Sequence, residues 1–201
     1  GDLGRYNEPI IPDPSSVAEA DYIVVESTYG DREHPVYDTK ERLAEIINET
    51  AKRGGHVLIP AFAVGRVQTL LLLISRLKKR GALPDVPIYL NSPMAVDATR
   101  IYHEFRSEHR LSVEECEAAC KVSKFVNSVE ESIELNKTKG PGIIISASGM
   151  CEGGRIKHHL RHNLSRPECA IVFAGFQAAG TLGRRIVDGA PSARIFGEEY
   201  P

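Results

Sequence analysis

The side chain best placed for chemistry in this sequence is the carboxylate of Glu26. It directly follows an apolar run at residues 22–25 and precedes Ser27, Thr28 and a tyrosine-glycine pair. The apolar run predicts a buried strand, and the polar residues after it predict a loop that opens toward a ligand. A charged side chain at the end of a buried strand is costly to keep there without a function. We therefore interpret Glu26 as a candidate catalytic residue.

A second carboxylate, Asp2, lies near the start of the chain. A lone aspartate is usually a surface or capping residue. Two carboxylates cannot hold zinc by themselves, because zinc sites use three or four ligands that are mostly His or Cys. The residues alone therefore give little support for a metal site at Asp2 and Glu26.

Four cysteines are present without paired metal-binding spacing, at Cys116, Cys120, Cys151 and Cys169. This usage is typical of free thiols in a reducing cytosol. Cys116 and Cys120 share one face of a predicted helix, so a metal site is conceivable. No nearby histidine completes the set, and we favour a structural role for both thiols.

Small and polar residues follow several predicted strands at the point where each strand leads into a helix. These junctions lie at residues 60–66, 91–95, 146–155 and 174–184. In an open parallel sheet they emerge together at the carboxyl edge, where ligands bind. Free amides, serine hydroxyls and glycines that allow close approach form an anion site, and phosphate is the expected ligand. Glycine and serine could simply turn the chain at any one junction, but four such junctions favour a phosphate-lined cleft.

Residues 153–166 contain arginine, lysine and histidine but no carboxylate. This segment is the one clear local basic patch in the sequence. Several cations beside a phosphate backbone would give salt-dependent affinity without reading the bases. A solvated helix face explains the same pattern equally well.

Strand and helix patterns alternate along the chain. Apolar runs without in-out alternation predict parallel strands, covered on both faces, at residues 56–60, 87–91, 142–148 and 170–175. Helical patterns occupy residues 39–52, 66–79, 95–106, 112–121 and 153–164. We therefore predict an α/β fold with a mostly parallel sheet and helices on both faces, which is a Rossmann-like arrangement.

The bulk properties restrict the function classes. The 201 residues can bury a sizeable core, and 42% hydrophobic with 26% charged residues is ordinary for a globular protein. The net charge of -2 gives no global signal for nucleic acid, so any polyanion site has to be local. No apolar run approaches the length of a membrane span and no signal peptide opens the chain, so we expect a cytoplasmic protein with no membrane partner.

Both ends of the sequence suggest a segment of a longer protein. The chain opens on GDLGR without Met and closes on RIFGEEYP, which resembles the start of a hairpin or strand. A strand at residues 22–25 would then lack its native neighbours. We expect the first 30 residues to pair with another copy, giving a homo-oligomer, or to pack back on the domain.

Six motifs occur in order along the chain: GDLGR, VVESTYGDREH, GGHVLIPAFAVGRVQTLLLLI, NSPMA, ISASGMCEGGR and GFQAAGTLGR. Together they resemble the β-CASP branch of the metallo-β-lactamase superfamily. The likeness extends to prokaryotic relatives of the endonuclease subunit of the mRNA 3′-end cleavage and polyadenylation specificity factor. Each motif alone is weak, but six in order are specific and cover essentially the whole chain.

The resemblance implies a zinc-dependent ribonuclease with a β-CASP domain inserted into a metallo-β-lactamase domain and an active site between the two. Asp2 matches the aspartate that bridges two zinc ions, and Glu26 matches an acidic residue that partners a catalytic histidine. The zinc pair would generate a hydroxide and clamp the scissile phosphate. The HxHxDH zinc motif would lie before Gly1, and the remaining zinc ligand and the catalytic histidine would lie after Pro201.

From this resemblance we assign residues 1–30 to the tail of the metallo-β-lactamase domain and residues 31–201 to the β-CASP domain. The expected partners are RNA and the remaining metallo-β-lactamase domain of the same chain. The fragment alone is expected to hold no stable zinc and to be inactive. The junctions and the likeness together predict RNA contacts at Arg66, Ser92, Ser146, Ser148, Gly149, Gly153, Gly154, Arg155 and Lys157.

Two alternatives remain. The chain could be a stand-alone module that grips RNA without catalysis. It could also be a nucleotide-binding α/β enzyme, but that function requires a GxGxxG motif after the first strand, where this sequence has GDREHP.

Overall fold

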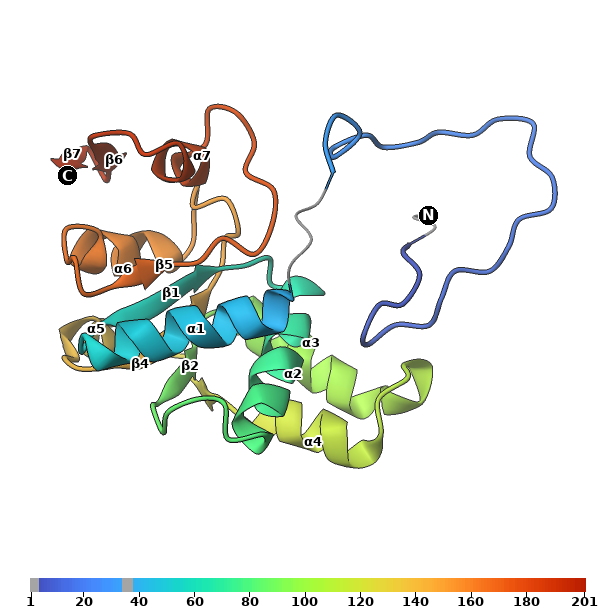
Figure 1. The fold of residues 1–201 in the computed structure, drawn as a ribbon, viewed down its shortest axis with the longest axis horizontal. Helices are drawn as coiled ribbons and strands as arrows, with labels where there is room; N and C mark the ends of the chain where they lie inside the picture. The colour runs from blue at the N-terminus through green and yellow to red at the C-terminus, as the bar shows by residue number, and fades with distance from the viewer. Residues whose placement is uncertain (1–3, 34–37) are drawn as a thin grey trace.

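The structure, a computed structural model, describes residues 4–33 and 38–201. From residue 39 onward, helices and strands alternate (Figure 1). The helices are α1 (Thr39–Lys52), α2 (Arg66–Lys79), α3 (Pro93–Glu104), the 3-10 turn η1 (Arg106–Glu108), α4 (Val113–Lys121), α5 (Val129–Lys137), α6 (Ile156–Asn163) and α7 (Leu182–Val187). The strands are β1 (His56–Pro60), β2 (Ile88–Leu90), β3 (Lys124–Phe125), β4 (Gly142–Ser146), β5 (Ala170–Ile171), β6 (Ala193–Ile195) and β7 (Glu198–Tyr200).

The central sheet has the strand order β3-β2-β4-β1-β5, and every pairing in it is parallel. The register of the central pair runs from His56 beside Gly142 to Pro60 beside Ser146. Every residue of β1 and β4 is buried. Strands covered on both faces have no solvent side, which explains the apolar runs without alternation. The predicted parallel α/β sheet is confirmed.

Alternate residues of the central strands enter two separate cores. Val57 and Ile59 pack in the core beneath α1, α2 and α3, whereas Leu58 packs with α6 and α7 on the opposite face. In Figure 1, α6 and α7 lie above β1, and α1 and α2 lie below it. α4 packs against α2 and α3 and forms an outer part of the lower layer. Helices therefore cover both faces of the sheet, as predicted.

Local signals explain where the helices begin and end. The predicted helices at residues 39–52 and 66–79 match α1 and α2. α3 starts two residues earlier than predicted, because Ser92 caps it and Pro93 occupies its first turn. α6 starts three residues later than predicted, because Gly154 has a φ of +74° and ends the preceding loop. α5 was not predicted, although Ser128 and Glu131 form a capping box at its start.

The end of the chain forms the antiparallel hairpin β6–β7. Phe196 and Gly197 occupy its two-residue turn with φ values of 52° and 88°. Positive φ at both positions is the geometry that two-residue hairpins favour. The hairpin expected at this end is confirmed.

The described helices are short and partly exposed. α1 and α2 have 14 residues each and carry charged side chains on their outer faces. Within residues 4–33 and 38–201, no helix is long and apolar enough to cross a membrane.

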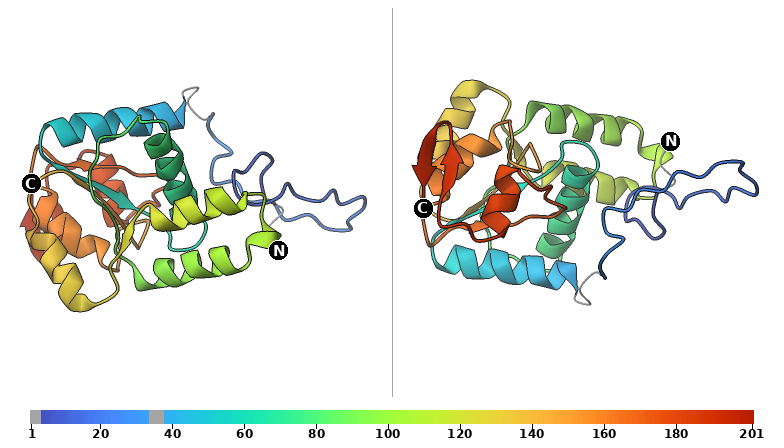
Figure 2. Two further views of the ribbon diagram at one scale, coloured as in Figure 1. Left: turned by 90° about the horizontal axis from the view of Figure 1, so that it is seen from below. Right: turned by 90° about the horizontal axis from the view of Figure 1, so that it is seen from above.

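Residues 4–33 contain no helix or strand, so the predicted strand at residues 22–25 is wrong for this structure. Tyr22 is 94% exposed and Val24 98% exposed. A strand needs a neighbour for its backbone hydrogen bonds, and no described strand lies beside this run. In both views of Figure 2 the blue segment loops away from the helices and strands.

Part of this segment does pack back on the domain. Ile10 is buried against Leu72 of α2 and Ala119 of α4. Its carbonyl accepts a hydrogen bond from the Arg110 amide at 2.9 Å, and the Arg110 guanidinium pairs with Asp13 at 3.1 Å. The expectation of back-packing is thus confirmed around Ile10 but not for residues 22–25.

Candidate functional site

The loops that follow the central strands meet at one edge of the sheet. β1, β2, β4 and β5 are parallel, so their carboxyl ends point the same way. The loops at residues 61–65, 91–92, 147–155 and 172–181 therefore gather at the edge where open α/β sheets bind ligands. The structure divides this edge into a closed half beside β2 and β4 and an open half beside β1 and β5.

Asn91 is the centre of the closed half. It is fully buried, and its side-chain amide donates to the Ser132 hydroxyl at 2.8 Å and to His159 Nε2 at 2.7 Å. Its side-chain oxygen accepts from Arg155 at 2.8 Å, and its backbone carbonyl accepts from the Ser146 hydroxyl at 2.7 Å. One residue thus joins the ends of β2 and β4 to α5 and α6. Asn91 begins the NSPMA motif, but only the serine that follows it was predicted as a site residue.

His159 is held as a neutral imidazole within this network. Because Nε2 accepts from Asn91, Nδ1 carries the proton and donates to the Asn136 side-chain oxygen at 2.7 Å. Burial lowers the pKa of His159 to about 3, and the nearby His158 and His162 act in the same direction. A neutral ring with both nitrogens occupied has a structural role at pH 7 rather than a role in moving protons.

Arg155 also turns toward the protein. Its guanidinium donates to Asn91 Oδ1 at 2.8 Å, the Val126 carbonyl at 3.0 Å and the Asn127 carbonyl at 2.7 Å. The Arg155 guanidinium therefore has few N–H groups left for the predicted contact with RNA. The side chain instead ties the start of α6 to the segment after β3.

Two of the predicted serine contacts belong to the same closed half. Ser146 is fully buried, and its hydroxyl donates to the Asn91 carbonyl. Ser92 is buried and caps α3 by accepting from the Ala95 amide at 3.4 Å. Burial removes both hydroxyls from solvent, which argues against direct contacts with RNA in this conformation.

The loop at residues 147–155 is held together by hydrogen bonds between its own residues. The Ser148 hydroxyl donates to the Gly153 carbonyl and accepts from the Gly153 amide, both at 3.2 Å. Gly154 has a positive φ, and a Cβ there would lie 2.3 Å from the Ala147 carbonyl oxygen. Gly153 has open space around it. The glycine pair predicted to approach RNA therefore contains one glycine that the loop itself requires.

A pocket of about 200 Å³ marks the open half. It lies between the loops after β1, β4 and β5, and Tyr29 from the N-terminal segment reaches its rim. The rings of Tyr29 and Phe176 meet edge to face with centroids 5.9 Å apart. The lining residues are Tyr29, Pro60, Ala61, Phe62, Arg66, Gly149, Met150, Ala174, Gly175, Phe176 and Gln177.

Arg66 is the cation of the open half. It begins α2 and is exposed, and no described residue accepts a hydrogen bond from its guanidinium. It borders this pocket, a hollow of about 340 Å³ beside Ile10, and a groove of about 600 Å³ between α1, α2 and β5. Phe62, 49% exposed, borders the first two of these hollows. An unpaired guanidinium beside exposed aromatic rings can hold a phosphate while a base stacks nearby.

The basic segment at residues 153–166 is largely paired in three dimensions. Arg161 pairs with Glu198 at 3.0 Å, and Arg166 pairs with Glu168 at 2.9 Å. The Lys157 ammonium lies 5.0 Å from the centre of the Phe196 ring. The local basic patch seen in the sequence therefore does not stand as a continuous cationic surface.

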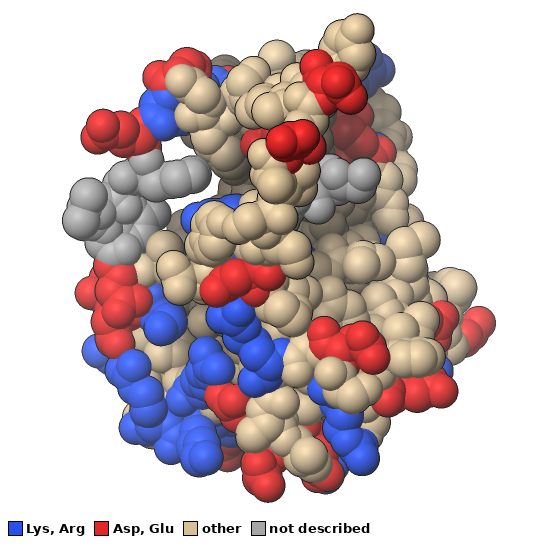
Figure 3. Space-filling model, turned by 90° about the vertical axis from the view of Figure 1, so that its right-hand side faces the viewer, with Lys and Arg blue, Asp and Glu red and all other residues tan. Residues whose placement is uncertain are grey.

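Opposite charges are mixed elsewhere on the surface as well. Three cations at the end of α2 are paired, Arg76 with Glu115, Lys78 with Asp85 and Arg80 with Glu41. On the face drawn in Figure 3, most Lys and Arg side chains lie in the lower left part, with Asp and Glu side chains around and between them. An anion site on this molecule thus depends on particular unpaired cations such as Arg66.

Of the two carboxylates predicted for a metal site, the structure describes only Glu26. Asp2 lies outside the described residues. Glu26 is exposed, and hydrogen bonds from the Thr28 hydroxyl and amide lower its pKa. The Thr28 amide donates to Glu26 at 2.9 Å. Among the described residues, Glu26 belongs to no group of side chains that could hold a metal ion.

Comparisons with known proteins agree with this architecture. Residues 67–186 match the family model of the Beta-Casp domain. The chain is 42% identical to Ribonuclease TTHA0252 of Thermus thermophilus and 34% identical to an RNase J-like protein of Methanocaldococcus jannaschii, in each case over its whole length and 48% of the relative. It is 35% identical to the transcription termination factor FttA of Thermococcus kodakarensis, over 97% of this chain and 31% of that protein. The chain spans about half the length, or less, of these curated relatives.

Proposed function

This chain belongs to the Beta-Casp domain family, and from that premise we propose that it is the RNA-binding part of a ribonuclease that hydrolyses RNA phosphodiesters. Two of the relatives named above are called ribonucleases or RNase-like. The observation that carries the proposal is the unpaired Arg66 beside exposed aromatic side chains at the carboxyl edge. Single-stranded RNA is bound by this combination, because cations contact its phosphates and rings stack on its bases.

Among the residues predicted to contact RNA, those of the open half make the main contacts in this proposal. Arg66 and Gly149 line its pocket, and Ser148 and Gly153 lie in the adjoining loop. Lys157 contributes at the start of α6. Gly154, Ser92, Ser146 and Arg155 act through the shape of the loops that carry the contacts.

In this proposal, zinc is required for catalysis by the longer protein that contains the metallo-β-lactamase domain. A zinc pair supplies Lewis acidity and an activated water for phosphodiester hydrolysis. Asp2 and Glu26 are the residues of this chain that we assign to that site. Two carboxylates do not form such a site, and Glu26 has no further ligands near it in the described residues. The remaining ligands would come from the metallo-β-lactamase domain of the same chain.

The exposed run at residues 22–25 supports that partner. Four exposed apolar residues in a row suit the edge of another sheet, which would bury their side chains and pair their amides. In a longer form of the protein that contains the metallo-β-lactamase domain, these amides should become protected from hydrogen exchange. If they exchange equally fast in both forms, this run does not pair with that domain. A cytoplasmic location and self-association through the same run remain predictions.

RNA binding is tested by fluorescence anisotropy with a short single-stranded RNA across a salt series. Arg66→Ala should weaken binding about fivefold and reduce the slope of log affinity against log salt by about 0.7, the loss of one phosphate contact. Arg161→Ala is the matched control, because that exposed arginine is already paired with Glu198. Equal slopes for wild type and Arg66→Ala would contradict the proposal.

Variants of Arg155 and Lys157 extend the same binding experiment. Lys157→Ala should weaken RNA binding without changing the folded structure. Arg155→Ala should mainly lower the melting temperature, because its guanidinium is hydrogen-bonded within the protein. If Arg155→Ala leaves stability unchanged and abolishes RNA binding, the closed half contributes the main RNA contact. An RNA-cleavage assay of the longer form distinguishes the two functions: cleavage supports a ribonuclease, and binding without cleavage supports a module that only binds RNA.

A further inference from the structure

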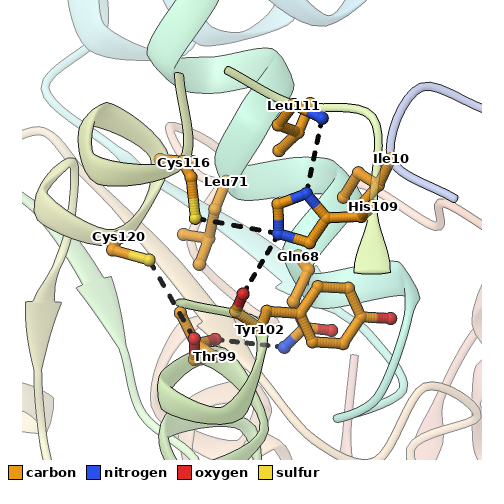
Figure 4. Close-up of a pocket in the computed structure, with 10 residues that line it drawn as sticks. Ile10, Gln68, Leu71, Thr99, Tyr102, His109, Leu111, Cys116 and Cys120 are labelled. Atoms are coloured by element: carbon orange, nitrogen blue, oxygen red, sulfur yellow. Dashed lines mark hydrogen bonds between the residues drawn. The ribbon is translucent and has the colours of Figure 1, made fainter. Parts of the chain in front are cut away.

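Two cysteines and two histidines converge between α3 and α4. Figure 4 shows three of them, Cys116, Cys120 and His109. Cys116 and Cys120 lie one turn apart on α4, so their thiols share a helix face. His103 lies in the last turn of α3, and His109 lies in the loop between the two helices. The packing of α3 on α4 thus brings His103 to the cysteine pair, and the prediction that no nearby histidine completes it is wrong.

The distances within this group suit a metal ion. Cys116 Sγ lies 3.8 Å from His103 Nδ1, and the ligand atoms of His103, Cys116 and Cys120 all lie within 4.8 Å of one another. Around tetrahedral zinc, bond lengths near 2.3 Å to sulfur and 2.0 Å to nitrogen place ligand atoms about 3.5–3.8 Å apart. The group needs only small side-chain adjustments to reach that geometry.

We propose that His103, Cys116 and Cys120 form a zinc-binding site. Two thiolates and one imidazole are the ligand types that zinc prefers over magnesium or calcium, which take oxygen ligands. Cys116 is buried, while His103 and Cys120 are partly exposed and give the ion a route of entry.

The fourth position is assigned to a water molecule. His109 Nε2 lies 3.9 Å from Cys116 Sγ but donates to the Tyr102 carbonyl at 3.1 Å, and His109 Nδ1 accepts from the Leu111 amide at 3.4 Å. Both ring nitrogens are thus occupied by the loop. A cavity of about 20 Å³ borders the two thiols, which is enough for one water.

The position of the site gives it a structural consequence. Ile10 of the N-terminal segment closes the same small cavity, and Ala119 lies between the two cysteines on α4. A bound zinc would join α3 to α4 and stiffen the surface on which Ile10 packs. Zinc should therefore stabilise the domain and tighten the attachment of its N-terminal segment.

The other two cysteines provide an internal comparison. Cys151 is buried in the opposite core with Ile156 and Leu160. Cys169 interacts with the His56 amide and the Asn163 side chain. Within the described residues, neither belongs to a group of three possible metal ligands.

The test uses the 201-residue chain, kept reduced, with zinc or cobalt as the only added metal. Wild type should bind one zinc per chain, and Co²⁺ should give thiolate charge-transfer and tetrahedral ligand-field absorption. Cys120→Ser and His103→Ala should each weaken zinc binding more than about 100-fold, because even the loss of a residue that merely supports a ligand costs up to that factor. Zinc should also raise the melting temperature of wild type but not of these variants.

Three controls separate this site from other zinc binding. Cys169→Ser and Glu26→Gln should retain zinc and the cobalt spectrum, and His109→Ala should keep the one-to-one stoichiometry. Cys116→Ala tests the buried thiol, and circular dichroism establishes whether it folds. The proposal is overturned if wild type binds no zinc, or if His103→Ala and Cys120→Ser bind as tightly as Cys169→Ser.

Discussion

The two halves of the carboxyl edge arise from similar junction sequences but use their polar groups differently. Beside β2 and β4, Asn91 hydrogen-bonds to both His159 and Arg155; Asn91 and His159 are fully buried, and Arg155 is partly buried. Beside β1 and β5, Arg66 stands exposed over a pocket with Phe62 at its rim. An arginine after a strand is thus a structural clamp in one half and a candidate ligand contact in the other. The difference lies in whether protein acceptors surround the guanidinium.

The largest effect that would distinguish the halves is expected at Asn91. Asn91→Ala should lower the free energy of unfolding by roughly 4 kcal/mol, because Ser132, His159 and Arg155 each lose a buried hydrogen-bond partner. Urea denaturation measures the loss. Asn127→Ala, an exposed asparagine beside the same network, should change stability by less than about 0.5 kcal/mol. Equal effects at the two positions would mean that the closed half is not a stabilising network.

A somewhat smaller effect is expected at the glycine pair of the 147–155 loop. Gly154→Ala should cost roughly 3 kcal/mol, because an alanine is strained at positive φ and its Cβ would displace the Ala147 carbonyl. Gly153→Ala should cost less than about 1 kcal/mol, since open space surrounds that position. Thermal denaturation of the two variants compares them directly. If Gly153→Ala is the more damaging change, the loop does not have the conformation described.

The smallest of these effects is the pH dependence that His159 confers. Its folded-state pKa of about 3 lies below the unfolded value near 6.5, so the unfolded chain takes up the proton first as pH falls. This contribution to stability is fully present above pH 6.5 and is lost progressively as pH decreases toward 3. Between pH 7 and pH 5 it should amount to about 2 kcal/mol.

The control for this prediction is His159→Gln, measured by urea denaturation at both pH values. The variant should lose less stability on acidification than wild type. Burial also lowers the pKa of His56, but that residue contributes in both proteins and cancels in the difference. Identical pH slopes would show that His159 is not held neutral. NMR titration of the His159 ring in wild type checks the same point without a substitution.

Much of the framework was predictable from local patterns. The strand at residues 56–60 and the first two helices were predicted with the observed bounds, and the strand predicted at residues 142–148 ends two residues earlier, at Ser146. Buried parallel strands and capped amphipathic helices have strong local signals. The strand expected at residues 22–25 failed, because a strand also depends on a neighbour that no local pattern reveals. The same limit applies to Glu26, whose predicted position rested on that strand.

The candidate site was predictable as an edge but not as a set of contacts. The order of strands and helices was enough to bring the four junctions to one side of the sheet. The sequence could not show which hydroxyls and guanidinium groups stay free of protein partners, because their hydrogen-bond acceptors come from distant segments of the chain. Arg161 illustrates this point, because the carboxylate that pairs with it lies 37 positions away in the terminal hairpin.

The sequence by itself determined the α/β class, the edge at which the ligand-binding loops gather and the likeness to the Beta-Casp family. These features follow from periodicity, capping and motif order, which are local properties of the chain. Only the tertiary structure decided that the Arg155 guanidinium is hydrogen-bonded within the protein while that of Arg66 is exposed, and that His103 lies beside Cys116. Asn91 lies 64 positions from Arg155, and His103 lies 13 positions from Cys116 on another helix. Contacts of this kind depend on how helices and strands pack, because hydrogen bonds and metal geometry act over a few ångströms in space and not along the sequence.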